Sequence, residues 1–233
     1  MATFFNGSNF IVDKASLTSV GSPVISRWAN ASAGLDALLD PWNLMLGLAV
    51  MFLARILGTL YIINNVEDEA IRTRGRRQLL VNTVPFLAFF LAFFIRTLLK
   101  DGYAVNAETG MIFMEPMKYL HNYLALWPTA VLTLVGVLLL LYGIVRSLLH
   151  SAYTKGIWPA GIGVVLVVLC LFLCAGLNDT AFYPSNADLQ SSLTIQNSCS
   201  SEFTLQTMAI VSVLVPFVFG YIAYVWRVMD RKK

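Results

Sequence analysis

The chain has 233 residues, of which 58% are hydrophobic and only 12% are charged, and its mean hydropathy is +0.70. This composition lies outside the range of soluble globular domains and indicates an integral membrane protein. Because 16 Lys and Arg against 13 Asp and Glu leave a net charge of only +3, and because there are just three cysteines, a disordered chain, a nucleic-acid-binding protein and a disulfide-stapled domain are excluded.

Five charge-poor segments are long enough to cross a membrane as helices, since a hydrocarbon core about 30 Å thick needs roughly 20 apolar residues. Their expected bounds, in chain order, are 42–64, 78–95, 124–145, 157–177 and 205–226. Only Arg55 interrupts the first, and the last three contain no formal charge. The sequence therefore predicts an all-α fold, a polytopic membrane bundle of about five helices over residues 42–233.

Residues 1–41 precede the first predicted span and contain no hydrophobic signal segment that would carry them across a membrane. Their first residues, Met1 to Phe5, are more typical of the end of a transmembrane helix than of a designed start. We therefore expect residues 1–41 to be an external segment that follows a further, upstream helix.

Basic residues near the span ends predict the orientation, because Lys and Arg are retained on the cytoplasmic side. One side of the predicted membrane carries Arg72, Arg74, Arg76, Arg77, Arg146, Lys155, Arg227, Arg231, Lys232 and Lys233. The other side carries Lys14, Arg27, Arg96, Lys100 and Lys118. The first group is twice as large, so we expect the N-terminus outside and the C-terminus in the cytoplasm.

Two kinds of surface are expected to pack the helices. Small residues let helix backbones approach closely in a membrane, and the candidates are Gly47, Gly58, Gly136, Gly161 and Gly163. The stretch 86–94 repeats aromatic and aliphatic residues, and it faces either lipid or another helix.

Few residues are suited to a self-sufficient active site. His121 is expected on the outer side and His150 on the inner side, so they cannot share a metal or a haem, and both are interpreted as solvated loop histidines. Cys170 and Cys174 share a helix face, but two thiols do not complete a tetrahedral metal site. Phosphate-binding loops and catalytic triads are absent from the sequence. No catalytic residue and no metal site is predicted.

Arg55 is the most informative single residue, because an arginine within a membrane span is costly and is usually paired or facing water. No other predicted span carries a carboxylate in its middle. Its counter-charge could come from another chain or from a bound anion such as a haem propionate or a lipid phosphate, to which guanidinium presents a bidentate fork. Pairing with a backbone carbonyl and snorkelling are the alternatives, and all remain open.

The segment 178–204 is long and polar and contains no Lys or Arg. A structureless loop of that length between membrane helices is usually functional or covered by a partner. Its composition indicates docking more than catalysis.

Several motifs together resemble a known family. They are the segment 40–49 that begins Asp40-Pro41-Trp42, the Arg72-x-Arg74 pair, Asp101-Gly102-Tyr103, and the segment 192–205 followed by a last helix that contains Pro216. In order and spacing they resemble subunit II of cytochrome bd-type quinol oxidases, in the form found in Bacteroidetes-type bacteria. The resemblance covers only the later part of that subunit, so the family's first four helices are not in this sequence.

The resemblance implies a companion role in a quinol:oxygen oxidoreductase of aerobic respiration, in the bacterial inner membrane. In this family, subunit I holds three haems and the quinol-oxidising loop, while subunit II stabilises it and sometimes holds a structural quinone. The expected partners are therefore subunit I and the lipid bilayer, with quinol as substrate of the complex. The family's proposed proton-delivering acids belong to its first helices, so no catalytic residue carries over, and the chain alone is expected to be non-catalytic.

A fragment of a secondary transporter is the alternative. Transporter sites lie at broken helices near the membrane midplane, and only Pro216 and Arg55 hint at such a site. Copurification with a haem-rich subunit would favour the oxidase, whereas substrate flux from this chain alone would favour the transporter.

Overall fold

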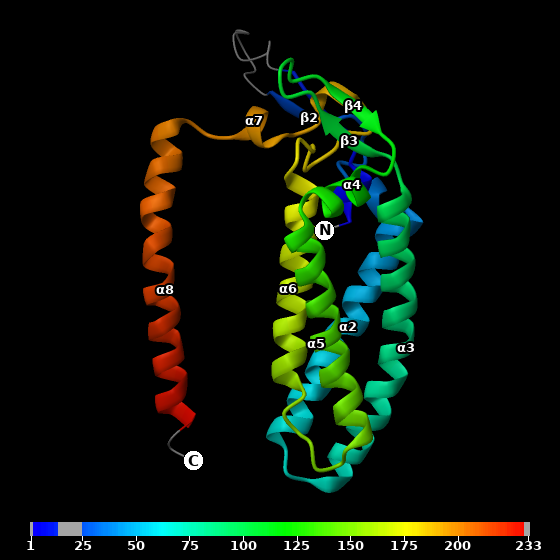
Figure 1. The fold of residues 1–233 in the computed structure, drawn as a ribbon, viewed down its shortest axis with the longest axis vertical. Coiled ribbons are helices and arrows are strands. Elements are labelled where there is room, and N and C mark those ends of the chain that lie inside the picture. Colours follow the sequence, from blue (N-terminus) through cyan, green and yellow to red (C-terminus); the bar gives the residue numbers. More distant parts are fainter. Residues whose placement is uncertain (1, 14–24, 231–233) are drawn as a thin grey trace. The chain divides into compact units, whose positions relative to one another are not determined.

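The structure, a computed structural model, describes residues 2–13 and 25–230. The chain divides into two compact units, Met1–Ile195 and Gln196–Lys233. Among the described residues, five helices are long and apolar enough to cross a membrane. The first unit contains α2 (Pro41–Asn65), α3 (Glu69–Leu99), α5 (Trp127–Leu149) and α6 (Ile157–Gly176), and the second contains α8 (Glu202–Asp230). The predicted all-α class with five helices able to cross a membrane is confirmed (Figure 1).

The turn between α2 and α3 is shorter than expected. Asp68 caps α3 by accepting a hydrogen bond from the backbone N–H of Ile71 at 2.9 Å, so the helix begins at Glu69, nine residues before the predicted start. Glu, Ala and Arg are good helix formers, which extends the helix through the arginine-rich segment. Its 31 residues span about 46 Å. Since the hydrocarbon core is about 30 Å thick, the arginine-rich turns can extend beyond it.

The third span begins later than expected, at Trp127 instead of residue 124. Residues 124 and 125 belong to a separate short helix, α4 (Lys118–Ala125), and the chain breaks at Leu126. Pro128 lies in the first turn of α5 and has no N–H to continue a helix from α4. The carbonyl of Leu126 instead accepts hydrogen bonds from the backbone N–H and the hydroxyl of Thr129.

The four spans of the first unit pack as two close pairs, α2 with α3 and α5 with α6, with far fewer contacts between the pairs. Two glycine contacts set the α5–α6 approach: a Cβ at Gly136 would lie 2.8 Å from the carbonyl oxygen of Gly163, and one at Gly143 would lie 2.5 Å from that of Gly156. Gly136 and Gly163 therefore pack helices as predicted. Gly47, Gly58 and Gly161 do not, because no described atom lies within 4 Å of the position their Cβ would take.

Two antiparallel hairpins that the sequence did not predict lie at one end of the first unit (Figure 1). Strands β1 (Phe10–Val12) and β2 (Ser26–Trp28) form the first, and β3 (Gly102–Val105) and β4 (Ile112–Glu115) form the second. The short helices α1 (Thr3–Asn6), η2 (Leu35–Leu38), η3 (Leu189–Ser191) and α7 (Ile195–Ser198) complete the described elements.

The expectation of a structureless loop after α6 is wrong for its first part. Thr180 bridges to Ala104 of β3, Ser185 bridges to Ser8, and Tyr183 pairs with Leu193. The Ser192 hydroxyl accepts a hydrogen bond from the buried backbone N–H of Ser185 at 2.9 Å. Short bridges of this kind leave no hydrophobic periodicity, which is the reason why the sequence pattern did not reveal them.

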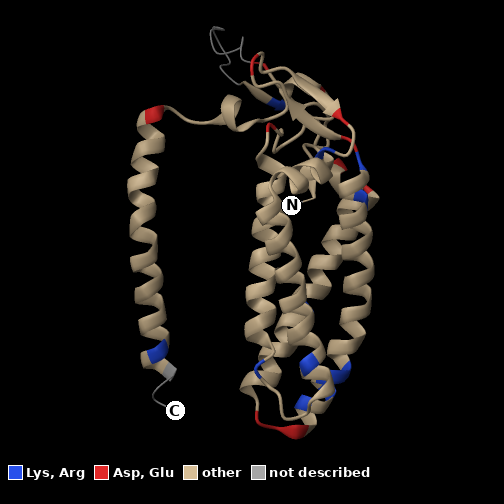
Figure 2. Cartoon of the chain, viewed as in Figure 1, with Lys and Arg blue, Asp and Glu red and all other residues tan. Residues whose placement is uncertain are grey.

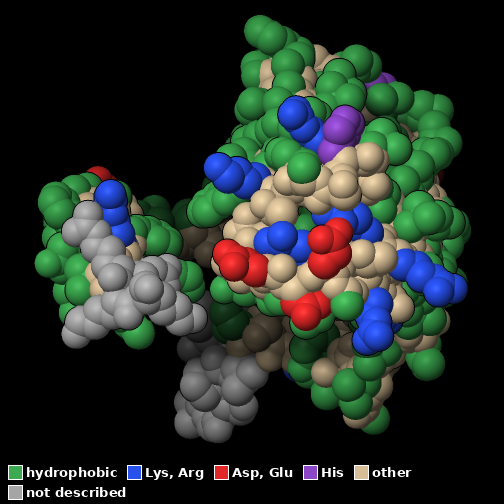
Figure 3. All heavy atoms as spheres, turned by 90° about the horizontal axis from the view of Figure 1, so that it is seen from below, with side chains coloured by type: hydrophobic (Ala, Val, Ile, Leu, Met, Phe, Trp, Pro, Cys, Tyr) green, Lys and Arg blue, Asp and Glu red, His purple; other side chains and the backbone are tan. Residues whose placement is uncertain are grey.

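Charged residues gather at the two ends of the first unit (Figure 2). The end where α2 leads into α3 and α5 into α6 holds Arg72, Arg74, Arg76, Arg77, Arg146 and Lys155. Figure 3 views this end and shows acidic side chains among the basic ones. The grouping agrees with the sides assigned from the sequence, whereas the orientation relative to the cytoplasm stays a prediction. Lys14, Arg231, Lys232 and Lys233 lie outside the described residues.

Candidate functional site in the four-helix unit

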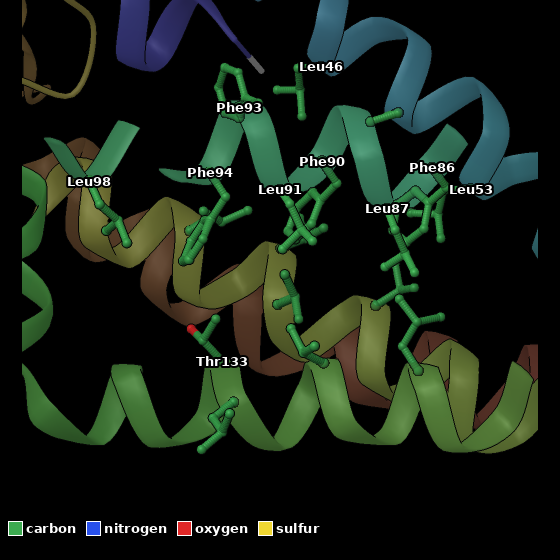
Figure 4. Close-up of a pocket in the computed structure, with 18 of the residues that line it drawn as sticks. Leu46, Leu53, Phe86, Leu87, Phe90, Leu91, Phe93, Phe94, Leu98 and Thr133 are labelled. Carbon is green, nitrogen blue, oxygen red and sulfur yellow. The ribbon is translucent and has the colours of Figure 1, made fainter. Parts of the chain in front are cut away.

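A cavity of about 480 Å³ separates the two helix pairs of the first unit (Figure 4). All four spans line it, together with α1 and α4. On α3 the lining contains Phe86, Phe90 and Phe94, which recur every four residues and therefore share one face. Their rings stack in sequence, with centroids 5.6 Å and 5.8 Å apart. The aromatic stretch 86–94 thus turns part of its surface towards a cavity and not only towards lipid or a helix.

The lining is almost entirely hydrocarbon. Its two polar side chains are Thr133, whose hydroxyl donates to the carbonyl of Thr129 at 2.8 Å, and Tyr123, which is buried. Among the described residues, the Tyr123 hydroxyl has no hydrogen-bond partner of normal geometry. Burial raises the pKa of this phenol above its usual range, Cys174 adds to the effect, and the nearby Thr133 hydroxyl opposes it. Tyr123 therefore holds a neutral donor at the edge of an apolar space.

This lining is poorly suited to haem. Haem iron in proteins takes axial ligands from His, Met, Cys or Tyr, and Tyr123 is the only such residue in the lining. Burial raises the pKa of Tyr123, which disfavours the phenolate that would bind iron. Both histidines lie elsewhere. His121 is in helix α4 and not in a loop as expected, and its Nδ1 lies 2.9 Å from Glu115 Oε1. The exposed His150 follows α5, so the two histidines lie at opposite ends of this helix of 23 residues. Groups of three or more metal-ligating side chains do not occur among the described residues.

The volume of the cavity has an energetic consequence. Side chains that face empty space lose van der Waals contacts on that side. An apolar occupant that fills about 480 Å³ between the helix pairs would restore these contacts, whereas water is a poor occupant of an apolar space.

A polar cluster ties the first turn of α2 and the last turn of α3 to the N-terminal segment. Asn6 donates to the Asn43 side chain at 2.8 Å and accepts from Arg96 at 3.1 Å, and Lys100 Nζ donates to the Phe5 carbonyl at 2.7 Å. The Arg96 guanidinium also lies 4.3 Å from the centre of the Trp42 ring. These contacts anchor α1 and satisfy both cations without a salt bridge.

Lys100 is the most perturbed base of this cluster. Burial and, to a smaller extent, the neighbouring Arg96 lower its pKa to about 8, while Asp40 and Asp101 act in the opposite direction. Nearby, the carboxylate of Glu115 binds Lys118 at 3.0 Å and His121 at 2.9 Å. The hydrogen bond from His121 is the largest cause that lowers the pKa of Glu115.

Asn122 forms a second anchor, between α4, α6 and the segment after α6. Its fully buried amide donates to the Cys174 carbonyl and to the Thr180 hydroxyl, each at 2.8 Å. Its oxygen accepts from Asn178 at 2.9 Å. Cys174 itself is buried and free, and its thiol lies 3.4 Å from the Tyr119 carbonyl. Cys170 and Cys174 therefore act as small packing residues in this unit.

Arg55 lies on the exposed surface of α2, away from the cavity lining. Fourteen residues of α2 precede it and ten follow it, so it is inside the apolar part of the helix. Its guanidinium makes no hydrogen bond or ion pair with any described residue, and only its backbone carbonyl accepts a bond, from Thr59 at 2.7 Å. The structure does not bring Arg55 together with a protein anion, so its predicted role as a contact to a partner or an anionic ligand stays a prediction.

The sequence profile of the family described as cytochrome bd terminal oxidase subunit II matches residues 1–229. The chain belongs to this family. Subunit 2 of the cytochrome bd-I ubiquinol oxidase of Escherichia coli strain K12 is 28% identical over 211 residues, which are 83% of this chain and 53% of that subunit. The counterparts from Escherichia coli O6:H1 and O157:H7 give the same values. The chain thus spans about half the length of the curated relatives it matches.

The motifs that suggested this subunit II family have structural roles in the fold. Asp40 caps α2 through the Trp42 N–H at 2.8 Å. Gly102 opens β3 where a Cβ would lie 2.6 Å from Lys118 Cβ, so only glycine fits this close approach. These residues shape the end of the four-helix unit where the strands lie, whereas Phe90 and Tyr123, which line the cavity, belong to none of the motifs. The four-residue phenylalanine repeat was the only signal in the sequence for the cavity.

Proposed function

We propose that the chain is a companion subunit of a cytochrome bd-type quinol:oxygen oxidoreductase and that it holds no haem itself. The match of the subunit II family over residues 1–229 carries the proposal. Haem would reside in the partner, subunit I, and quinol would be the substrate of the complex. The apolar lining without His, Met or Cys supports this division of roles.

In this role the chain contributes structure to the complex. Its hydrocarbon-lined four-helix unit would stabilise the haem-bearing subunit in the bacterial inner membrane, with the arginine-rich end in the cytoplasm. A structural quinone, which the resemblance to the family implies for some of its members, belongs to the same proposal.

Arg55 supports a partner within the membrane. A guanidinium without a protein anion in the apolar part of a span favours an acidic group from another chain or ligand. A carboxylate of the partner subunit would pair with it bidentately.

Affinity purification of the tagged chain from its native membrane tests the proposal. We expect a haem-rich subunit to copurify and the preparation to show a reduced-minus-oxidised haem spectrum. The chain expressed alone should be spectrally silent. A stable chain that never captures a haem-bearing partner would reject the oxidase role, and solute flux from liposomes containing the chain alone would favour the transporter alternative.

A further inference from the structure

The cavity between the helix pairs opens on the membrane-facing surface of the first unit. Leu91 of α3 and Leu134 of α5 both line the cavity, yet they are 47% and 61% exposed. Leu91 is seen between the two helices in Figure 4. Both residues lie well inside their spans, so the opening faces the hydrocarbon layer and not water. A ligand entering here would come laterally, from the bilayer.

The shape and chemistry of this space fit one long hydrocarbon chain. The volume of about 480 Å³ is within the range of ligand pockets, roughly 300–1,000 Å³. A water molecule needs only about 10–15 Å³ of such space, so the cavity has room for a run of many methylene groups. Apolar cavities stay dry, and burying each methylene is favourable. Water is therefore a poor occupant, and a fatty acyl chain is a good one.

Tyr123 makes the α4 end of the cavity different from the rest of its lining. It belongs to α4, outside the spans, and its hydroxyl is the polar group of the lining that lacks a partner among the described residues. The ester carbonyl of a phospholipid lies at the boundary between headgroup and hydrocarbon, where a phenol is well placed to donate to it. A quinone head, in contrast, presents two carbonyl oxygens at opposite edges, and Thr133 already donates to Thr129.

We propose that this cavity binds one acyl chain of a phospholipid as a structural component of the subunit, with the ester group next to Tyr123. The lipid would join the α2–α3 pair to the α5–α6 pair, which otherwise make few contacts with each other. The proposal concerns the bilayer and does not depend on the oxidase role.

A matched pair of variants on α5 tests the proposal. Val137 lines the cavity, whereas Val135 is 41% exposed and does not line it. The full chain with its partners is purified in a mild detergent, and retained phospholipid is counted by native mass spectrometry and lipid extraction. We expect Val137→Trp to lose one phospholipid per chain and Val135→Trp to keep it. Equal lipid content in the two variants would overturn the proposal.

A photoreactive lipid gives a second test that does not need a folded tryptophan variant. Phosphatidylethanolamine with a diazirine midway along one acyl chain is added to membranes holding the wild-type complex. We expect crosslinks on cavity residues such as Phe90 and Val137, and at least a threefold loss of these crosslinks in Tyr123→Phe. Crosslinks confined to exposed positions such as Leu138, or recovery of one prenyl quinone per chain that Val137→Trp alone removes, would refute an acyl chain as the occupant.

Discussion

The α5–α6 contact predicts that two glycine substitutions on the same helix have opposite effects. A Cβ added at Gly163 would contact the Gly136 carbonyl oxygen and lie 2.7 Å from the Leu140 backbone nitrogen. Both are backbone atoms, so they cannot move aside as a flexible side chain can, and the two helices must separate. No described atom lies within 4 Å of a Cβ added at Gly161. Gly163→Ala therefore tests close packing, and Gly161→Ala is its control.

The expected magnitudes follow from these contacts. Overpacking costs about 1–3 kcal/mol, and Gly163→Ala should lower the melting temperature by roughly 2–12 °C at about 2–4 °C per kcal/mol. Gly161→Ala should leave it unchanged or raise it, because Ala is more favourable than Gly in a helix by about 1 kcal/mol. Thermal unfolding in detergent, followed by size-exclusion chromatography, measures both. If Gly163→Ala is as stable as Gly161→Ala, the inference of a tight backbone contact is wrong.

Three further predictions concern polar residues. The folded state lowers the pKa of Lys100 from 10.5 to about 8. Between these pH values the unfolded state binds more protons than the folded state, so the stability of the fold should rise with pH. In melting experiments at several pH values, Lys100→Met should remove this rise and Lys155→Met should retain it. Asn122→Ala should destabilise the folded chain by about 1–3 kcal/mol, because it leaves the buried Cys174 carbonyl and Thr180 hydroxyl without this partner. Asn65→Ala, at an exposed site, should change the stability by less than about 0.5 kcal/mol in the same melting experiment. Arg55→Leu should reduce the haem that copurifies with the chain at least twofold without reducing insertion of the chain into the membrane. Arg55→Lys keeps the positive charge and should retain more haem. Unchanged haem content in Arg55→Leu would show that Arg55 is not part of the interface.

The helix ends show where local sequence signals competed. The apolar run of the second span begins near residue 78, but α3 begins at Glu69 because the Asp68 cap and good helix formers continue the helix through charged residues. In the third span the apolar run begins before Pro128, yet the proline divides it into α4 and α5. Hydropathy thus located both spans, and backbone chemistry set their first residues.

The sequence by itself determined the class, the number of spans and the family. These follow from composition, from the length of apolar runs and from motifs, all of which are local properties of the chain. The sequence did not determine which glycines form the contacts between helices. Gly161 and Gly163 lie two residues apart, and only Gly163 packs against the backbone of a neighbouring helix. The cavity was likewise decided by the tertiary structure, because Phe90 of α3 and Val137 of α5 line one space only when the two helix pairs are brought together. An apolar side chain has the same hydropathy whether it faces lipid, another helix or a cavity, and this is the physical reason why only the assembled bundle distinguishes them.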